Sequence, residues 1–203
     1  MENPINGMDL KIREVARRIR DLREVSGISP EEMAQRTGTN FDGEKFYVNL
    51  LGVEYAISYP AAAFTPGAAL PVQTFLLRWL LEGKKVSWQG NWKTFREMPW
   101  GELYIKPYTG RVLTRAAFTF GTRVAKFEAA MEKLGAKKLQ YGDAGYELEL
   151  MPGYAMRLMV WEGDDEFPPN AQILYSDNFI DSFSAEDRVV SGDILISVVK
   201  NNM

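Results

Sequence analysis

The stretch GYELELMPGYAMRLMVW (residues 145–161) decides the fold of the second half of this chain. Over 146–150, apolar residues alternate with glutamates, which is the period-two pattern of a strand with one buried face. The pair Pro152-Gly153 is typical of a turn, and a second apolar run follows over 155–161. The stretch therefore predicts an antiparallel strand pair, and residues 172–175 predict a further short strand.

The rest of the chain shows strand pairs and helices in blocks. Alternating residues over 46–50 and 53–59, on either side of Gly52, predict a second hairpin. Helical spacing and capping residues predict helices over 71–82, 111–120, 123–134 (with Thr122 as N-cap and Gly135 after its end) and 184–200 (with Ser184 and Asp187 as capping pair). Glycine and proline interrupt residues 84–108, where short strands and turns are expected. Such blocks predict an α+β fold, with an antiparallel or mixed sheet and helices packed mainly on one side.

A helical hairpin is expected to precede this domain. Apolar residues recur at helical spacing over 10–25, and Ser29 begins a second helix as its N-cap. Pro30 at the first helical position and Glu32 in a capping box support this start, and Gly38 is a suitable end. We predict a hairpin over 1–40 as an appendage to an α+β domain over 41–203.

Composition excludes several kinds of chemistry. The 203 residues are 46% hydrophobic and 25% charged, with a net charge of −3, which is typical of a globular chain with no global attraction to nucleic acid. There is no cysteine and no histidine. Zinc, haem and iron–sulfur sites with these ligands, and Ser-His-Asp triads, are therefore excluded. No cofactor is predicted, although carboxylates could hold Mg²⁺ or Ca²⁺.

No apolar run reaches the length of about 18–20 residues that spans a bilayer, so no membrane contact is expected. The start of the chain has no basic region leading into an apolar one, so no signal peptide is predicted. We therefore expect a cytoplasmic protein.

The first candidate site is WEGDDEFPP (residues 161–169), where carboxylates follow an apolar strand. Asp164, Asp165 and Glu166 could raise one another's pKa values, as an acid–base pair requires, or hold a hard cation. The spacing is not that of an EF-hand. The alternative is a solvated acidic turn in which Trp161 and Phe167 anchor the core.

Two further segments could contribute to a site. Trp88, Trp92 and Arg96 lie in a segment rich in tryptophan and basic residues that could stack a planar ligand, although such aromatics also form cores. Asp143 lies between Gly142 and Gly145 in a tight turn that could approach a ligand, or simply connect two elements.

Two resemblances to known families are present. IREVARRIRDLREVSGISPEEMAQRTG (residues 12–38), within the segment 8–38, resembles the first two helices of lambda-repressor-like helix-turn-helix regulators, truncated before the later helices. The arginines of the first helix are largely balanced by acidic residues, so nucleic acid binding is not favoured.

Residues of about 44–200 resemble an uncharacterised bacterial and archaeal family, domain-of-unknown-function family 3786. The matching segments are FYVNLLGVEYAISYP, GNWKTFREMPWGELY, LQYGDAGYEL, VWEGDDEFPPNAQILYSDN and FSAEDRVVSGDIL. The resemblance implies a role in anaerobic metabolism near corrinoid or one-carbon chemistry. Some members carry a cysteine-rich iron–sulfur segment, which this chain cannot form. The resemblance supplies no catalytic residues.

Three functions remain open. The first is a ligand-binding or accessory protein that binds a small molecule or a protein partner. Its binding cleft would be formed by Trp88, Trp92, Arg96, Asp143, Asp164, Asp165 and Glu166. The second is an enzyme with paired carboxylates, one of which must be partly buried with a raised pKa. The third is a DNA-binding regulator that uses the N-terminal helices. The first function is preferred, because no catalytic centre is recognised. Separately, exposed N-terminal helices would favour a homodimer.

Overall fold

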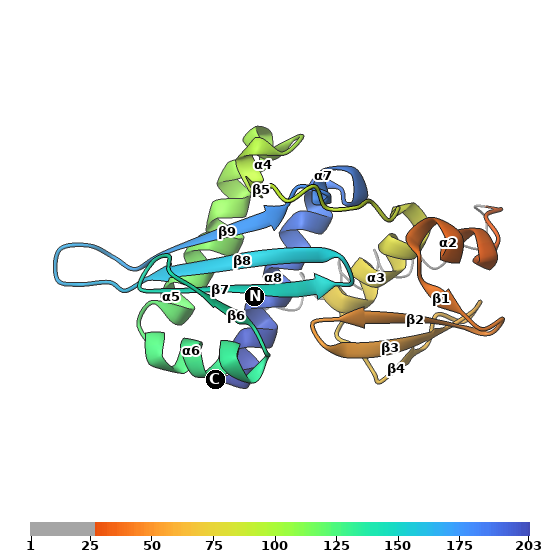
Figure 1. Cartoon of the computed structure of the whole chain (residues 1–203), viewed down its shortest axis with the longest axis horizontal. Helices are drawn as coiled ribbons and strands as arrows, with labels where there is room; N and C mark the ends of the chain where they lie inside the picture. Colours follow the sequence, from red (N-terminus) through yellow and green to blue (C-terminus); the bar gives the residue numbers. More distant parts are fainter. Residues whose placement is uncertain (1–26) are drawn as a thin grey trace, which may run out of the picture. The chain divides into compact units, whose positions relative to one another are not determined.

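The computed structural model describes residues 27–203, which form two compact units that divide between Lys85 and Val86 (Figure 1). The division predicted at residues 40 and 41 falls inside the first unit, where α2 (Pro30–Thr37) contacts β1 (Asn40–Phe41). The helix predicted over 10–25 lies outside the described residues.

The ends of α2 follow the predicted side-chain chemistry. The hydroxyl of Ser29 accepts a hydrogen bond from the N–H of Glu32 over 3.1 Å, and Pro30 begins the helix. Gly38 ends it in the left-handed region, at φ 63°. On the same helix, the Arg36 guanidinium donates to the carbonyls of Leu80 and Gly83 at 2.9 Å. Arg36 thereby satisfies carbonyls at the end of α3 (Leu70–Glu82) that have no partner within that helix.

The first unit contains an antiparallel sheet in the order β1-β2-β3-β4. The predicted hairpin is confirmed as β2 (Lys45–Leu50) and β3 (Val53–Ser58), and β4 (Phe64–Thr65) adds a short edge strand. Alternate side chains of β2 are buried, as the period-two pattern requires. Helix α3 (Leu70–Glu82) is apolar nearly all round and buries six side chains.

The second unit contains a five-stranded antiparallel sheet in the order β5-β9-β8-β7-β6. Its strands are β5 (Trp92–Thr94), β6 (Lys137–Leu139), β7 (Ala144–Met151), β8 (Tyr154–Trp161) and β9 (Asn170–Ser176). Tyr146, Leu158 and Ile173 lie side by side on three strands and are fully buried. The α+β class and the antiparallel pairing are confirmed, but the strands divide between two sheets, which the sequence pattern did not predict.

Helices cover one face of this second sheet (Figure 1). The segments that contact its strands are the π-helical η2 (Thr109–Thr114), α5 (Arg115–Phe120) and α6 (Val124–Lys133). Helix α8 (Ala185–Asn202) packs on these three and on α4 (Gly101–Tyr108), and the short α7 (Phe179–Ser182) lies between β9 and α8 in the chain. The prediction of turns up to residue 108 is wrong at α4, which continues through Pro107 into η2. Proline disfavours the interior of a helix. Here the burial of Tyr108, whose ring stacks on Phe95 with centroids 3.9 Å apart, stabilises the helix despite Pro107.

Around α6 and α8, two helix ends were predicted correctly and one was not. Ser184 and Asp187 form the expected capping box of α8, and Gly135 follows α6 with a φ of 71°. Thr122 is not the N-cap of α6. Arg123 holds that position, and the Thr122 hydroxyl donates back to the Phe118 carbonyl over 3.4 Å. Within residues 27–203, no helix is long and apolar enough to cross a bilayer.

Candidate functional site

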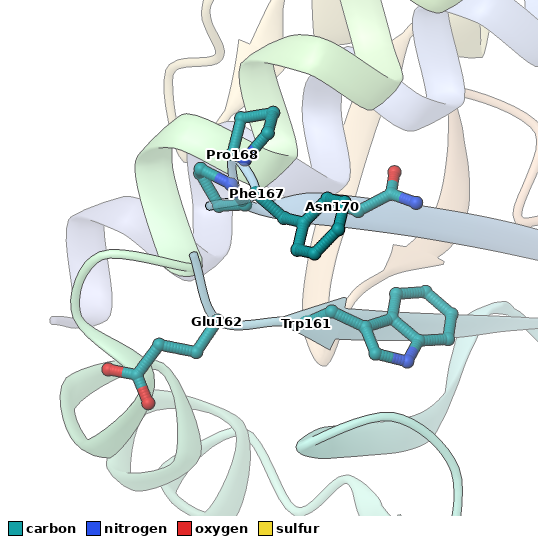
Figure 2. Close-up of a pocket in the computed structure, with 6 residues that line it drawn as sticks. Trp161, Glu162, Phe167, Pro168 and Asn170 are labelled. Atoms are coloured by element: carbon teal, nitrogen blue, oxygen red, sulfur yellow. The ribbon is translucent and has the colours of Figure 1, made fainter. Parts of the chain in front are cut away.

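An open pocket of about 470 Å³ lies at the base of the loop that joins β8 to β9. It is lined by Trp161, Glu162, Phe167, Pro168, Pro169 and Asn170 (Figure 2). All six belong to the acidic segment or to the residue that follows it, so the first candidate segment of the sequence forms a pocket.

The residue pair of β8 and β9 that lies next to their connecting loop forms one wall of the pocket. Trp161 ends β8 directly opposite Asn170, the first residue of β9. The Trp161 indole also approaches Gly142, which has a φ of 68°. A Cβ at Gly142 would lie 2.7 Å from the Val160 carbonyl oxygen and 3.5 Å from the indole. Glycine is therefore required at this turn, both for its backbone conformation and for the close approach of β8.

Asp143 connects the start of the β8–β9 loop to the turn before β7 through a hydrogen bond. Its carboxylate accepts a hydrogen bond from the Glu162 N–H over 2.7 Å, and its own N–H donates to the Val160 carbonyl over 3.0 Å. The far end of the loop is close to α5, because a Cβ at Gly121 would lie 2.6 Å from the Cβ of Pro169. Both ends of the loop are thus held by the rest of the unit, which gives the pocket fixed walls.

Asp164 shapes the tip of the loop. Its carboxylate accepts hydrogen bonds from the N–H groups of Phe167 (2.7 Å) and Glu166 (2.8 Å), and its N–H donates to the Phe167 carbonyl (2.9 Å). These backbone donors stabilise the ionised form and lower the pKa of Asp164. The side chain is exposed. Asp164 is therefore a turn-forming residue, and it lacks the raised pKa that the carboxylate-enzyme hypothesis requires.

The two aromatic residues of the pocket are exposed, at 37% for Trp161 and 67% for Phe167. The alternative in which both rings anchor the core is therefore wrong. Figure 2 shows the Trp161 and Phe167 rings and the Asn170 amide on one side of the loop, with the Glu162 side chain directed away from them. The Trp161 Nε1–H and the Asn170 Nδ2 hydrogens donate to no residue in the described part of the chain, so both are available to a ligand.

Negative charge surrounds the pocket. Glu162, Asp165 and Glu166 are exposed, and no lysine or arginine among residues 27–203 forms an ion pair with them. Such a field attracts cations and repels anionic ligands. In the same described range, no group of three or more carboxylates lies close enough together to hold a metal ion.

The second candidate segment lies elsewhere on the sheet. Trp88 and Trp92 meet edge to face, with ring centroids 5.0 Å apart, and the guanidinium of Arg157 lies 4.0 Å above the Trp92 ring. The same Arg157 forms an ion pair of 2.9 Å with Glu147. Trp88 donates its indole N–H to the Asn91 carbonyl over 2.8 Å. The Trp88 indole N–H and the Arg157 guanidinium thus have partners within the second unit.

The strand register separates the seven predicted site residues into two groups. Trp92 lies opposite Ser176, the last residue of β9, whereas the acidic loop joins β9 at its first residue, Asn170. Six residues of strand span roughly 20 Å. Asp143 joins Asp164, Asp165 and Glu166 at the loop end, while Trp88 and Trp92 lie at the other end. Arg96 is exposed and pairs with Glu102 at 3.0 Å. A single cleft formed by all seven is therefore not present.

None of the six residues that line the pocket was among the seven predicted site residues. The sequence carried a partial signal, since all of them except Asn170 lie within the acidic segment, and Asn170 follows it directly. Arg157 was also missed, because its contact with Trp92 depends on the strand order β5-β9-β8, which brings together residues 65 positions apart.

The fold and the pocket define an α+β protein made of two antiparallel-sheet units, with an aromatic surface pocket on the second. The chain belongs to the family described as Domain of unknown function (DUF3786), whose family model matches residues 29–198. The match begins at Ser29 and so includes α2. No curated protein and no solved structure matches the chain.

Proposed function

We propose that this protein binds a planar, uncharged or cationic ring compound in the pocket between Trp161 and Phe167. The observation that carries the proposal is the exposure of two large aromatic side chains in a pocket whose backbone is held at both ends. Apolar pockets with a few convergent polar groups are the usual form of small-ligand sites.

The groups of the pocket define the class of ligand. The Trp161 and Phe167 rings offer faces for stacking, and the free hydrogens of Trp161 Nε1 and Asn170 Nδ2 require acceptor atoms on the ligand. The exposed carboxylates of Glu162, Asp165 and Glu166 disfavour phosphate groups and favour a positive charge. A heterocycle with ring nitrogens or carbonyl oxygens and no phosphate meets all three requirements.

The biological setting of this binding role rests on the resemblance to the family, which implies an accessory protein of anaerobic metabolism. That setting makes pterins and corrinoids reasonable probes besides nucleosides. Among these, pterins and nucleosides carry a single flat ring system without phosphate, as the proposed class of ligand requires. The carboxylate-enzyme alternative gains no support from Asp164, and DNA binding through the N-terminal helices stays the least favoured hypothesis.

Thermal unfolding with added ligands tests the proposal. The full chain would be heated with a pterin, adenosine, ATP, a corrinoid, Mg²⁺ or Ca²⁺, each at millimolar concentration. A compound that binds only the folded state adds about 2.7 kcal/mol of stability at a hundredfold excess over its Kd. We expect the pterin or adenosine to raise the midpoint, and ATP, which shares the adenosine ring but adds phosphates, to have little effect.

Two variants and a matched control locate the site. Trp161→Ala and Phe167→Ala remove exposed side chains, so they should fold normally and abolish the shift. Trp100→Ala removes an equally large tryptophan that is 69% exposed and does not line the pocket, and it should keep the shift. If no planar compound stabilises the wild type, or if the shift survives in Trp161→Ala, the proposed site is wrong.

A further inference from the structure

The candidate pocket lies in a field of negative charge that no ion pair neutralises. Exposed carboxylates surround it on the β8–β9 loop and on the turn before β7, and they are those of Glu162, Asp164, Asp165, Glu166 and Asp143. Among residues 27–203, no lysine or arginine forms an ion pair with any of them. The N–H groups of Phe167 and Glu166 lower the pKa of Asp164, with no contribution from a basic side chain.

Arg123 is a basic residue close to the loop, but its charge is held at a helix end. Gly121, two positions before it, packs against Pro169, since a Cβ at Gly121 would lie 2.6 Å from the Cβ of Pro169. The Arg123 guanidinium donates to the Thr119 carbonyl over 3.0 Å, in the last turn of α5. A cation there offsets the partial negative charge of the helix end. The carboxylates of the loop and turn therefore outweigh this one guanidinium, and the pocket attracts positively charged ligands.

The two rings of the pocket determine which kind of cation fits. The exposed faces of Trp161 and Phe167 carry partial negative charge, so a cation over such a face is attracted to it. A ring face accepts only weak hydrogen bonds, so an ammonium group would lose its hydrogen bonds to water without full replacement. A nitrogen that carries alkyl groups in place of hydrogens has no such donor to satisfy. The pocket therefore favours an N-alkylated cation over a protonated amine.

Asn170 adds a second requirement for the ligand. Its Oδ1 accepts a hydrogen bond from the Ala171 N–H over 2.8 Å, which fixes the orientation of the amide. Asn170 therefore presents its Nδ2 hydrogens to a ligand, directly opposite Trp161 at the end of the two strands. Figure 2 shows this amide and the two rings on the same side of the loop. A ligand that lies over the rings can thus place a carbonyl oxygen against Asn170.

We propose that the pocket selects a planar aromatic cation with an N-alkylated ring nitrogen and a carbonyl oxygen. This inference rests on the proposed function, which allows uncharged and cationic rings alike, and it restricts the ligand to the cationic class. The carboxylates supply the preference for positive charge, the rings supply the surface for stacking, and Asn170 supplies a donor for the carbonyl oxygen. An uncharged ring of the same shape gains only the stacking and the hydrogen bond.

Isothermal titration calorimetry of the full chain tests this preference with two probes of equal size. 1-Methylnicotinamide carries its methyl group on the ring nitrogen and is a permanent cation. 6-Methylnicotinamide carries the methyl group on a ring carbon and is uncharged at neutral pH. We expect the cation to bind roughly tenfold tighter at about 50 mM salt, and this ratio to shrink at about 500 mM, because salt screens the carboxylates. The affinity of the uncharged probe should stay nearly constant.

Two double variants locate the source of the preference. Asp165→Asn with Glu166→Gln removes two charges of the loop, and it should lower the ratio of the two affinities severalfold while the uncharged probe binds as before. Glu149→Gln with Asp181→Asn is the matched control and should keep the ratio. Both of its residues are exposed and lie at the other end of the strands, since Glu149 pairs with Ala155 near the start of β8 and Asp181 follows the end of β9.

The possible outcomes separate this inference from the proposed function. Equal affinity for the two probes at low salt, or a ratio that survives the loss of both loop charges, overturns the preference for a cation. If 1-methylnicotinamide binds equally well to Trp161→Ala, its attraction comes from the acidic loop without the pocket, and the inference is also overturned. If neither probe binds while adenosine or a pterin does, the proposed function stands and this inference is wrong. If no planar compound binds, both fail.

Discussion

Asp143 and Glu162 join two segments of the second unit through one hydrogen bond of 2.7 Å, in which the Glu162 N–H donates to the Asp143 carboxylate. The bond links the turn before β7 to the loop after β8. Because the loop carries the exposed rings of the candidate pocket, this bond determines where the pocket begins. The sequence identified both residues as members of candidate segments but could not indicate that they meet.

Replacing Asp143 should therefore affect both stability and the pocket. Asp143→Ala removes the acceptor, and we expect a loss of about 1 kcal/mol in the free energy of unfolding, measured by urea denaturation. The same variant should weaken binding of any ligand that stabilises the wild type. Asp165→Ala removes a carboxylate that makes no hydrogen bond in the described structure, and its stability should stay within about 0.5 kcal/mol of wild type. Equal losses of unfolding free energy in the two variants would contradict the role of Asp143 in holding the loop.

Asp164 makes the stability of the protein depend on pH. Its pKa is lowered in the folded state by the N–H groups of Phe167 and Glu166, so its contribution is fully present above the ordinary aspartate value of 3.8. That contribution is lost as the pH falls through the lower pKa of the folded state. Asn at this position can still accept hydrogen bonds but does not titrate. We therefore expect the stability difference between wild type and Asp164→Asn to shrink below pH 3.8, in urea denaturation series at several pH values. A difference that is constant with pH would refute the assignment.

Gly101 should tolerate no side chain. A Cβ there would lie 1.9 Å from the Phe95 carbonyl oxygen, which is backbone and cannot move aside without shifting the turn. We expect Gly101→Ala to cost about 3 kcal/mol of unfolding free energy or more, by the mechanism of overpacking. Gly110→Ala is the control, because no atom lies within 4 Å of its added Cβ. In that exposed helical position alanine should be neutral or stabilising by up to about 1 kcal/mol, and thermal unfolding of the two variants decides the comparison.

Local side-chain chemistry explains which elements the sequence predicted well. The caps at Ser29 and Ser184 and the turn at Pro152-Gly153 depend on residues within three positions of one another, so the sequence contains all of the interaction. Helix α4 was missed for the opposite reason. Pro107 and Gly110 favour turns locally, and the helix forms because Tyr108 stacks on Phe95 and approaches Tyr175.

The candidate site was predicted in part, again for a physical reason. The acidic segment is contiguous, so the sequence located the segment that forms the pocket, but it singled out Asp164, Asp165 and Glu166 and not the Trp161 and Phe167 that line it. The grouping with Trp88 and Trp92 depended on strand order and register, which place Trp92 beside Ser176 and not beside Asn170. Sequence spacing contains no information on that register across strands that are separated by tens of residues.

A buried pair of tyrosines offers a test of the core beneath α4. The hydroxyls of Tyr108 and Tyr175 lie 3.1 Å apart, and Tyr175 donates its proton to the Arg188 carbonyl, also over 3.1 Å. Burial raises the pKa of both phenols, so both keep their protons at neutral pH. Since Tyr175 has only one proton to donate, Tyr108 must be the donor of the bond between them.

This direction predicts unequal effects of two similar substitutions. Tyr175→Phe leaves the buried Tyr108 hydroxyl without a partner, while the Arg188 carbonyl keeps its bond from the Ser191 hydroxyl, at 2.8 Å. Tyr108→Phe leaves Tyr175 with its own donor bond intact. We expect losses of about 2–3 kcal/mol for Tyr175→Phe and about 1 kcal/mol for Tyr108→Phe in urea denaturation. The double variant should lose less than the sum of the two, because the unpaired hydroxyl is then absent. If Tyr108→Phe proves the more damaging substitution, the hydrogen bond between the tyrosines runs in the opposite direction.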